Sequence, residues 1–449
     1  MIFSMDVRRA RKGDCLLLHF GTKNDPGLIM IDGGPKSVYK PHLKPRLMEI
    51  RKARGLGQNE SLPVDLLMVS HVDDDHIQGI LDLTTEEVAA KRAQRPQLVN
   101  VLSFWHNSFD AVIDHTPNEL TASVKKQFGT AAVSGSGALP DGKKAEVEDR
   151  YLANNPDEEE EDSKTVLTST LKVLASIEQG FRLRLNADFL DFPHSPEFEG
   201  GLVMARADQG VTPIAHGLSF TVVGPMQAEL ADLHEKHQKW LEDLKKKGKS
   251  PPEALAAYVD KSVANLSSIV VMAEAGGKRM LLTGDARGDK VLEGLQFVGL
   301  LAAGKNSTIE VDLLKVPHHG SANNLETGFF KRIIAKHYVF SGDGVHGNPE
   351  REALEMLLNA RGTAKEYTIH LTYPVKEIDV ERKKDWEKAR GTELKRRKKN
   401  PKAKVRKAWS PASNGISALL KAHPNFAAKI SIVDEKKPHV IDLLDPLGF

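Results

Sequence analysis

The chain has 449 residues, more than one compact core usually holds, so we expect one large domain with insertions or two domains. Its 40% hydrophobic and 28% charged content is typical of a globular protein, and no apolar run reaches the roughly 18 residues that a membrane span needs. Cys15 is the only cysteine, which excludes an intrachain disulfide and a thiolate-rich zinc site. The N-terminus shows no signal-peptide pattern, so these features together predict a cytoplasmic protein without a membrane partner.

The net charge of +2 is unevenly distributed along the chain. Residues 381–407 contain 14 Lys or Arg against 4 Asp or Glu, a local net charge of +10, whereas residues 157–162 are almost wholly acidic. We interpret the acidic run as solvated surface or a disordered loop. The basic run is either solvated surface as well or a contact for a polyanion such as nucleic acid. The candidate contacts are Lys395, Arg396, Arg397, Lys398 and Lys399.

The first hundred residues predict strands that end in polar residues. Residues 2–20 alternate as two strands around an Arg-rich turn, and residues 27–31 form a third strand that runs into Asp32 and a glycine turn. Further along we expect a helix at 43–54, a buried strand at 64–70, a helix at about 77–93 and a strand at 98–105. Residues 1–105 therefore form the first half of an α/β unit.

The pattern weakens between residues 106 and 215, which we interpret as an insertion, partly helical, with a mobile segment near 131–163. Regular elements return in residues 216–375, the second half of the same unit. There we expect strands near 218–223, 267–274, 279–283, 311–316, 338–341 and 367–372, and helices at 227–247 and 350–359. We interpret residues 376–449 as a basic C-terminal extension that ends in an antiparallel strand pair, 429–433 with 439–444.

One short stretch carries most of the chemistry. Ser70-His71-Val72-Asp73-Asp74-Asp75-His76 follows the buried strand at 64–70 and precedes a helix. Carboxylates so close together repel one another unless a cation or protons lie between them. In extended chain, residues two apart point to the same side, so His71 and Asp73 can approach one cation, and Asp75 and His76 can reach a second cation at the turn into the helix. Asp74 is expected to face solvent or to cap the helix.

Other predicted strand ends supply further polar residues. Asp32 ends one strand, Asp285 follows Gly284 after another, and His318 and His319 follow a third, with His346 after a fourth. A carboxylate with two oxygens is suited to bridge two metals. Two metals roughly 3.5–4 Å apart hold a bridging hydroxide and stabilise both oxygens of a displacement at phosphorus or carbon.

Taken together, these motifs resemble the metallo-β-lactamase superfamily. The resemblance rests on Gly13-Asp14, Ile31-Asp32-Gly33-Gly34, His71-x-Asp73-x-Asp75-His76, Thr283-Gly284-Asp285 and His318-His319-Gly320-Ser321, in this order over residues 1 to about 350. The branch that the chain most resembles is the hydrolase domain of the DNA-uptake competence protein ComEC and its soluble relatives. The resemblance implies an α/β (α+β) fold, a four-layer αββα sandwich, here with a partly helical insertion and a basic C-terminal extension.

The resemblance also implies roles for the residues. His71 and Asp73 would belong to a first metal site, Asp75 and His76 to a second, and Asp285 would bridge them. Either His318 or His319 would complete the second site, with His319 favoured because it directly precedes the glycine. Two further residues would act without binding a metal. Asp32 would orient a ligand histidine, and His346 would line the substrate cleft and assist the leaving group. Asp75 would also orient the attacking hydroxide.

The chain departs from the pattern of that family at three positions. Asp73 stands where relatives usually have histidine, no histidine is evident near Val222-Val223-Gly224-Pro225, and Asn348 stands where relatives often have a histidine before the proline. The first site is therefore poor in imidazole, which moves its preference toward harder ions. We expect two divalent metal ions, zinc or manganese.

Three functions remain open from the sequence. The first is a metal-dependent hydrolase acting on phosphodiesters or nucleic acid, because the resembling branch is nuclease-like and a basic stretch is present. The second is a hydrolase of a small ester, lactone or cyclic nucleotide, with the insertion as the roof of a pocket. The third is a catalytically weak member that binds nucleic acid or a partner protein of unknown kind, because the first metal site is depleted.

Overall fold

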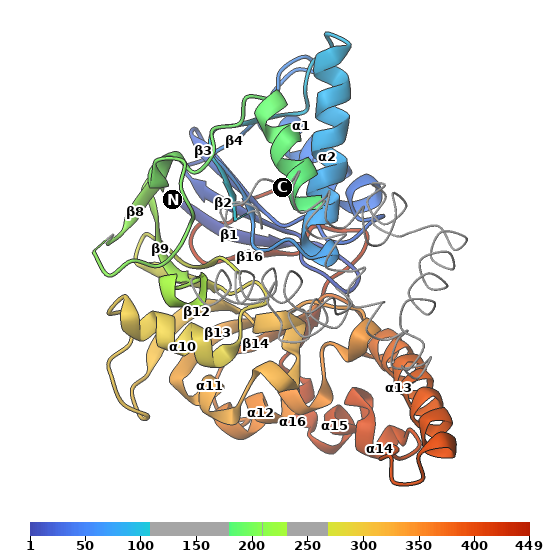
Figure 1. Ribbon diagram of the computed structural model, residues 1–449. Helices are drawn as coiled ribbons and strands as arrows, with labels where there is room; N and C mark the ends of the chain where they lie inside the picture. The colour runs from blue at the N-terminus through green and yellow to red at the C-terminus, as the bar shows by residue number, and fades with distance from the viewer. Residues whose placement is uncertain (108–178, 209, 231–267) are drawn as a thin grey trace, which may run out of the picture.

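The computed structural model describes residues 1–107, 179–208, 210–230 and 268–449, which form a mixed α/β fold with two large sheets (Figure 1). The first sheet has the order β16-β1-β2-β3-β5-β7 and the second has the order β15-β14-β13-β12-β11-β10-β9-β8. A small two-stranded sheet, β4-β6, is not paired with a strand of either large sheet. The described part of the chain contains no helix that is long and apolar enough to cross a membrane.

The first sheet is built mainly from the N-terminal hundred residues, whose strands are almost wholly buried. Its strands are β1 (Ile2–Val7), β2 (Leu16–Gly21), β3 (Pro26–Ile31), β5 (Leu66–Val69), β7 (Phe104–His106) and β16 (Val440–Asp442), and the small sheet pairs β4 (Leu62–Val64) with β6 (Val99–Val101). β1, β2 and β3 are antiparallel neighbours, whereas β5 is parallel to β3. The carboxyl ends of β3 and β5 therefore meet at one edge of the sheet.

The second sheet contains the remaining strands. They are β8 (Thr212–Ala215), β9 (Leu218–Gly224), β10 (Val270–Ala275), β11 (Lys278–Leu282), β12 (Ile309–Lys315), β13 (Ile333–Phe340), β14 (Thr368–Leu371) and β15 (Ile430–Ile432). β11, β12, β13 and β14 are parallel neighbours, so their carboxyl ends also lie along one edge. Such an edge is where layered α/β proteins place their ligand sites.

Helices cover the outer faces of both sheets (Figure 1). The helices are α1 (Lys44–Ala53), α2 (Asp74–Arg92), a helix at 179–189, α10 (Gly288–Phe297), α11 (Thr327–Arg332), α12 (Arg351–Arg361), α13 (Val375–Lys399), α14 (Pro411–Asn414), α15 (Ile416–Ala422) and α16 (Pro424–Ala427). Short helical turns are η1 (Tyr39–Leu43), η3 (Pro196–Phe198), η4 (Pro317–Gly320), η5 (Ala322–Asn324) and η6 (Val345–Gly347). α13 is the longest of these helices and projects from the body of the molecule (Figure 1).

Three buried clusters hold these elements together. One takes residues from both large sheets, such as Leu18 and Ile29 from the first and Val271 and Leu313 from the second. The other two lie between each sheet and its helices. Burying a Leu or Ile side chain contributes about 1.5–3 kcal/mol, so the contact between the inner sheet faces is a major source of stability. This packing brings the polar edges of the two sheets together.

Most predicted elements are confirmed, with three corrections. α2 begins at Asp74, three residues earlier than expected, so Asp75 and His76 lie in its first turn. The strand expected at 98–105 is two short strands in different sheets, β6 and β7. The predicted antiparallel pair at the C-terminus is wrong: β15 extends the second sheet parallel to β14, and β16 pairs with β1 in the first sheet. The last residues of the chain are thus part of both sheets and not an appended hairpin.

Two sequence predictions fall outside the described residues. The segment at 131–163 lies there entirely, and so does all but the first turn of the helix expected at 227–247.

Candidate metal centre

Three strand ends and the turn before β2 meet where the two sheets face each other. β5 leads into Ser70 and His71, and β11 leads through Gly284 to Asp285. β12 ends just before His318 and His319. Asp14, His76, Asp285 and His319 each offer an atom within 4.8 Å of the others, and all four side chains are buried. Residues about 300 positions apart in sequence are therefore gathered in one polar cluster.

Three of these atoms form a nearly equilateral triangle. The Nε2 atoms of His76 and His319 are 3.2 Å apart, and Asp285 Oδ1 lies 3.2 Å from the first and 3.3 Å from the second. Zinc bonds of about 2.0–2.1 Å at tetrahedral angles place ligand atoms about 3.3–3.4 Å apart. An octahedral ion with bonds of the same length needs a spacing of about 2.9 Å. The triangle therefore fits three ligands of a tetrahedral zinc site.

An unsatisfied polar atom supports the same interpretation. Among the described residues, His71 Nε2 is buried without a hydrogen-bond partner, and it lies 3.8 Å from Asp285 Oδ2. A buried polar atom without a partner costs about 1–3 kcal/mol, and a cation bound between these two atoms would remove that cost. The residues present therefore fit a bound metal.

The second oxygen of Asp285 faces another group of possible ligands. Asp285 Oδ2 lies 3.8 Å from His71 Nε2 and 3.6 Å from His318 Nε2. His71 Nε2 is in turn 3.8 Å from Asp73 Oδ2. These contacts are longer than those of the triangle, and the side chains of Asp73 and His318 are 35% and 29% exposed. We call the triangle the tight half-site and the group of His71, Asp73 and His318 the open half-site; Asp285 lies between them.

Asp75 lies at the edge of the tight half-site. Its Oδ2 is 4.0 Å from His319 Nε2, and the side chain is 19% exposed. The carboxylate is therefore close to the triangle while still reachable from solvent.

The ring of His76 is fixed from behind by Asp32. Asp32 Oδ2 lies 2.8 Å from His76 Nδ1 and accepts the Ser70 hydroxyl at 2.7 Å, while Oδ1 accepts the Ser70 backbone N–H at 2.7 Å. A carboxylate on Nδ1 places the proton there and leaves Nε2 free to bind a metal. This geometry agrees with the orienting role expected for Asp32.

The ring of His319 is fixed by residues to which the sequence alone assigned no role. His319 Nδ1 lies 2.9 Å from Ser341 Oγ and 3.4 Å from Asp14 Oδ1. Asp14 also accepts the Ser341 hydroxyl and forms an ion pair with Lys315. Two signals were present in the sequence: Asp14 belongs to the Gly13-Asp14 motif, and Lys315 is a charged residue directly after the apolar pair Leu313-Leu314.

A close backbone contact explains the glycine of that motif. A Cβ atom at Gly13 would lie 1.8 Å from the carbonyl oxygen of Asp75, which also accepts the Asp14 N–H at 3.2 Å. Only glycine allows the turn before β2 to approach the start of α2 this closely. The motif therefore places Asp14 against the metal centre.

Both histidines after β12 have left-handed backbone conformations. The φ angles are 47° at His318 and 53° at His319, a region that costs non-glycine residues of order 1–3 kcal/mol. This tight turn allows two consecutive side chains to point toward the same carboxylate. Strain of this kind is typical of functional sites.

The electrostatics of the cluster favour charged groups. Although burial acts in the opposite direction, the carboxylates of Asp285 and then Asp14 raise the pKa of His319 to about 9. Burial likewise opposes the rise at His76, where Asp285 and then Asp32 raise the pKa well above its usual value. Burial, followed by the charge of His76, lowers the pKa of His71 to about 4. The carboxylates around His76 and His319 therefore favour a positive charge at this point of the centre.

Some predicted site residues lie elsewhere. His346 is exposed in η6 and lines a cavity of about 610 Å³ together with Asp385 and Trp386 of α13. Lys395, Arg396, Arg397 and Lys398 are exposed on the last turns of α13, and Lys399 is its last residue. The basic candidates thus lie on a helix and not on a loop.

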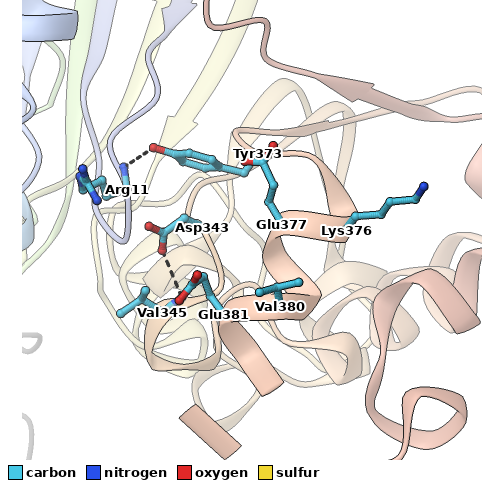
Figure 2. Close-up of a pocket in the computed structure, with 8 residues that line it drawn as sticks. All are labelled: Arg11, Asp343, Val345, Tyr373, Lys376, Glu377, Val380 and Glu381. Carbon is cyan, nitrogen blue, oxygen red and sulfur yellow. Dashed lines mark hydrogen bonds between the residues drawn. The ribbon is translucent and has the colours of Figure 1, made fainter. Parts of the chain in front are cut away.

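A second cavity, of about 470 Å³, is formed where the turn before β2, the loop after β13 and the start of α13 meet (Figure 2). The backbone N–H of Arg11 donates to the Tyr373 hydroxyl at 2.8 Å across this cavity. Arg11 is three residues before Asp14, and Asp343 is two residues after Ser341, so the loops that line the cavity are those that support His319. Acidic and basic side chains both line it, so it is not a neutral pocket.

Comparisons with known proteins add little. No protein-family profile matches the chain. The chain is 36% identical over 80 residues to the microtubule-associated protein futsch of Drosophila melanogaster, covering 18% of this chain and 1% of that protein. It is 28% identical over 136 residues to microtubule-associated protein 1A of Rattus norvegicus, covering 30% of this chain and 5% of that protein. The chain thus spans 1% to 5% of the length of these curated relatives.

Proposed function

We propose that this protein is a metal-dependent hydrolase of the metallo-β-lactamase superfamily, with a four-layer αββα sandwich, that acts on phosphodiesters, most specifically nucleic acid. The observation that carries this proposal is the triangle of His76 Nε2, His319 Nε2 and Asp285 Oδ1, with edges of 3.2–3.3 Å. The helix-covered sheets and the order of motifs that resembles ComEC-type hydrolase domains support the same fold.

The two half-sites suggest unequal metal affinities. The tight half-site has buried ligands whose rings are held by Asp32 and by Ser341, so little ordering is needed when a metal binds. The open half-site combines a histidine and a carboxylate that are partly exposed. We expect zinc in the tight half-site and a weaker, harder ion such as manganese in the open one.

His318 changes the ligand set that the resemblance implied. The resemblance assigned one of the two consecutive histidines as a ligand, whereas the structure directs His319 to Asp285 Oδ1 and His318 to Asp285 Oδ2. His318 therefore supplies an imidazole on the side where Asp73 replaces one. Both histidines are candidate ligands, one for each half-site.

The residues of the chain have separable tasks in this reaction. When bound, divalent metals supply a Lewis acid and an activated water for displacement at phosphorus. Asp285 directs one oxygen toward each half-site and would help to hold an ion in each. Asp75, near the triangle and partly exposed, is placed to accept a hydrogen bond from the attacking water. Asp32 and Ser341 hold the ring tautomers that leave each Nε2 free.

The position of α13 supports a nucleic-acid substrate. A Cβ atom at Gly344 would lie 2.3 Å from the carbonyl oxygen of Ile378, so the first turns of α13 pack directly on the loop that follows Ser341. The whole helix has 25 residues and is about 37 Å long at 1.5 Å per residue. Its exposed basic residues are Lys376, Lys383, Lys384, Lys388, Lys395, Arg396, Arg397 and Lys398. We call these residues the basic ridge. A polyanion bound along the basic ridge would extend toward the loop that follows Ser341, which supports the metal centre.

The two tryptophans of this region pack on one another. The rings of Trp386 and Trp409 are edge-to-face with centroids 5.9 Å apart, and Trp386 Nε1 donates to the Lys407 carbonyl at 2.8 Å. The Arg406 guanidinium covers the Trp386 ring at 5.1 Å. These contacts fix the segment after α13 against the helix.

A hydrolase of small esters, lactones or cyclic nucleotides is the second candidate. It requires a closed, neutral pocket, and both cavities described here are lined by acidic and basic side chains. A binding protein with little catalysis is the third candidate, and the openness of one half-site is the feature that favours it.

Metal analysis followed by an activity assay tests the proposal. Purified protein is assayed for metal content, then for cleavage of single-stranded DNA, RNA and a chromogenic phosphodiester with added zinc or manganese. We expect at least one tightly held metal per chain and turnover that is lost in the Asp75→Ala/Asp285→Ala variant. Asp82→Ala, which changes a carboxylate further along α2, serves as the matched control and is expected to retain turnover. Equal turnover in the Asp75→Ala/Asp285→Ala variant would contradict the proposal.

A further inference from the structure

Lys315 is a fully buried lysine at the centre of the molecule. Its side chain is 2% exposed, and it ends β12, three residues before His318. Lysine is almost never buried to this degree unless it is paired. Its partners are all at the metal centre: an ion pair with Asp14, a hydrogen bond to the Gly284 carbonyl at 3.2 Å, and Asp285 Oδ1 at 4.0 Å.

Asp14 has the chemistry of a metal ligand but not the position of one. One of its oxygens pairs with Lys315 and the other accepts the Ser341 hydroxyl. Its contacts with the histidines are to Nδ1 atoms, 3.4 Å at His319 and 3.8 Å at His76. The Nε2 atoms that form the triangle lie on the opposite edges of those rings. Asp14 therefore stands behind the ligands with both oxygens occupied.

The positive charge of Lys315 stabilises the negative charge of the buried Asp14 carboxylate. Burial alone would raise the pKa of the Asp14 carboxyl, but Lys315 and then His319 hold it well below its usual range. The carboxylate thus keeps its negative charge and is directed to the lysine and not to the triangle. Without the ammonium group, a buried carboxylate this close to a divalent cation would gain more from binding that cation than from any other neighbour.

We propose that Lys315 is an internal cation that holds Asp14 behind His319, as its positioning partner, and keeps this carboxylate out of the coordination shell of the tight half-site. Lys315 therefore limits the number of ligands and the negative charge offered to the metal. This inference rests on the proposed metal centre and deepens it, because it assigns a residue that sets metal affinity and coordination without touching the metal.

Replacing the lysine predicts a gain and not a loss of metal affinity. Lys315→Met keeps the length and apolar bulk of the side chain but removes a positive charge 4.0 Å from Asp285 Oδ1 and releases one oxygen of Asp14. Metal affinity rises with the charge of the ligand set, and we expect about tenfold or more here. The extra carboxylate also raises the coordination number.

Cobalt(II) provides a readout that is independent of activity, because its visible d–d absorption weakens as the coordination number rises. The protein is loaded with cobalt as wild type, Lys315→Met, Asp14→Asn and the double variant, and affinities are measured by competition with a chelator. We expect Lys315→Met to bind more tightly with weaker absorption, and the absorption to return to that of the wild type in the double variant, which has no carboxylate at position 14. Unchanged affinity and absorption in Lys315→Met, or weaker absorption that persists in the double variant, would overturn the proposal.

Circular dichroism reports whether Lys315→Met folds. If it does not fold, Asp14→Asn alone still tests the proposal. Because Asp14 is not a ligand, this variant should retain the absorption of the wild type while binding about 10–100-fold more weakly, the usual effect of losing a partner behind a ligand. A changed spectrum would make Asp14 a ligand and would overturn the inference. If the wild-type protein itself binds neither cobalt nor zinc, the proposed metal centre fails, a result distinct from normal wild-type binding with unresponsive variants.

Discussion

The Nε2 atoms of His76 and His319 lie 3.2 Å apart, although the two histidines follow strands of different sheets. His76 is in the first turn of the helix that follows β5, and His319 is in the turn that follows β12. Each ring is held at its Nδ1 edge by its own partners, Asp32 for one and Ser341 for the other. Two imidazoles directed at one point from separate elements are what a metal site requires.

The first prediction concerns these two rings. His76→Ala and His319→Ala should each lower the metal content of the purified protein by about one ion per chain, because three ligands are the minimum for a stable site. Elemental analysis of the purified variants measures this. His423→Ala is the matched control, since His423 is an exposed histidine far from the centre in sequence, and its metal content should equal that of the wild type. Full metal content in both cluster variants would exclude the triangle as the binding site.

The second prediction tests the orienting carboxylate. Asp32→Asn keeps the shape of the side chain but removes the charge that fixes His76, so zinc affinity should fall about 10–100-fold. Competition with a fluorescent chelator measures the affinity. Asp25→Asn is the control: Asp25 contacts a histidine in the same way, 2.7 Å from His216 Nδ1, but on an exposed surface. An equal loss of zinc affinity in the two variants would show that the loss does not depend on the position of Asp32 at the metal centre.

The third prediction tests the open half-site. Asp73→His places an imidazole beside His71 and should shift the preference of this half-site from manganese toward zinc, because imidazole is a softer ligand than carboxylate. Titration of the zinc-loaded protein with each metal measures the shift. Asp74→His adds a histidine at the next position, where the wild-type carboxylate lies 3.8 Å from the Lys12 ammonium, and should leave the preference unchanged.

The fourth prediction concerns pH and a chain of histidines outside the metal centre. His370 Nε2 lies 3.0 Å from His337 Nδ1, and His370 Nδ1 lies 2.8 Å from His439 Nε2, which links β14 to the segment before β16. Burial, followed by the charges of His439 and His337, lowers the pKa of His370 to about 3. The His370 side chain is therefore protonated near pH 6.5 in the unfolded chain, but only near pH 3 in the folded protein.

Folding stability should accordingly fall as the pH falls from about 6.5 toward 3, by up to about 1.4 kcal/mol per pH unit from this residue. Burial also lowers the pKa values of His439 and His337, although Asp6 and Asp312, respectively, oppose the shift. Urea unfolding at pH 7 and pH 5 measures it. His370→Gln should reduce the difference in unfolding free energy between the two pH values, whereas the exposed His423→Gln should not. An unchanged pH dependence in His370→Gln would show that this residue does not cause the loss of stability.

The fifth prediction tests the basic ridge. Lys395→Glu/Arg396→Glu should weaken the binding of single-stranded DNA and lower the salt dependence of the binding constant by about one contact per lost charge. Fluorescence anisotropy at several salt concentrations measures both. Lys23→Glu/Lys305→Glu makes the same change in charge at exposed positions away from α13 and serves as the control. If both variants weaken binding equally, the effect is one of net charge and the ridge is not a specific contact.

The sequence was sufficient for the local part of this structure. Strands follow from the alternation of apolar residues, a property of neighbouring positions, so most strands were predicted within a few residues. Most helices after residue 280 were not predicted, among them α13. The candidate ligands were also predicted, because several carboxylates and histidines directly after a buried strand are difficult to attribute to packing alone. The early start of α2 was missed because Asp74 and Asp75 favour a helix N-terminus through the helix dipole, which the apolar pattern does not reveal.

Relationships between distant residues were decided only by the tertiary structure. The pairing of β15 with β14 and of β16 with β1 depends on which sheet edge is free after the rest of the chain has folded. The same is true of the centre: His318 and His319 reach different oxygens of one carboxylate because of a left-handed turn, and Lys315 meets Asp14 across 301 positions of sequence. A sequence shows which residues can bind a metal. The packing of two sheets determines which of them face it, because side chains from separate strands are brought to a common point only when the core between the sheets is formed.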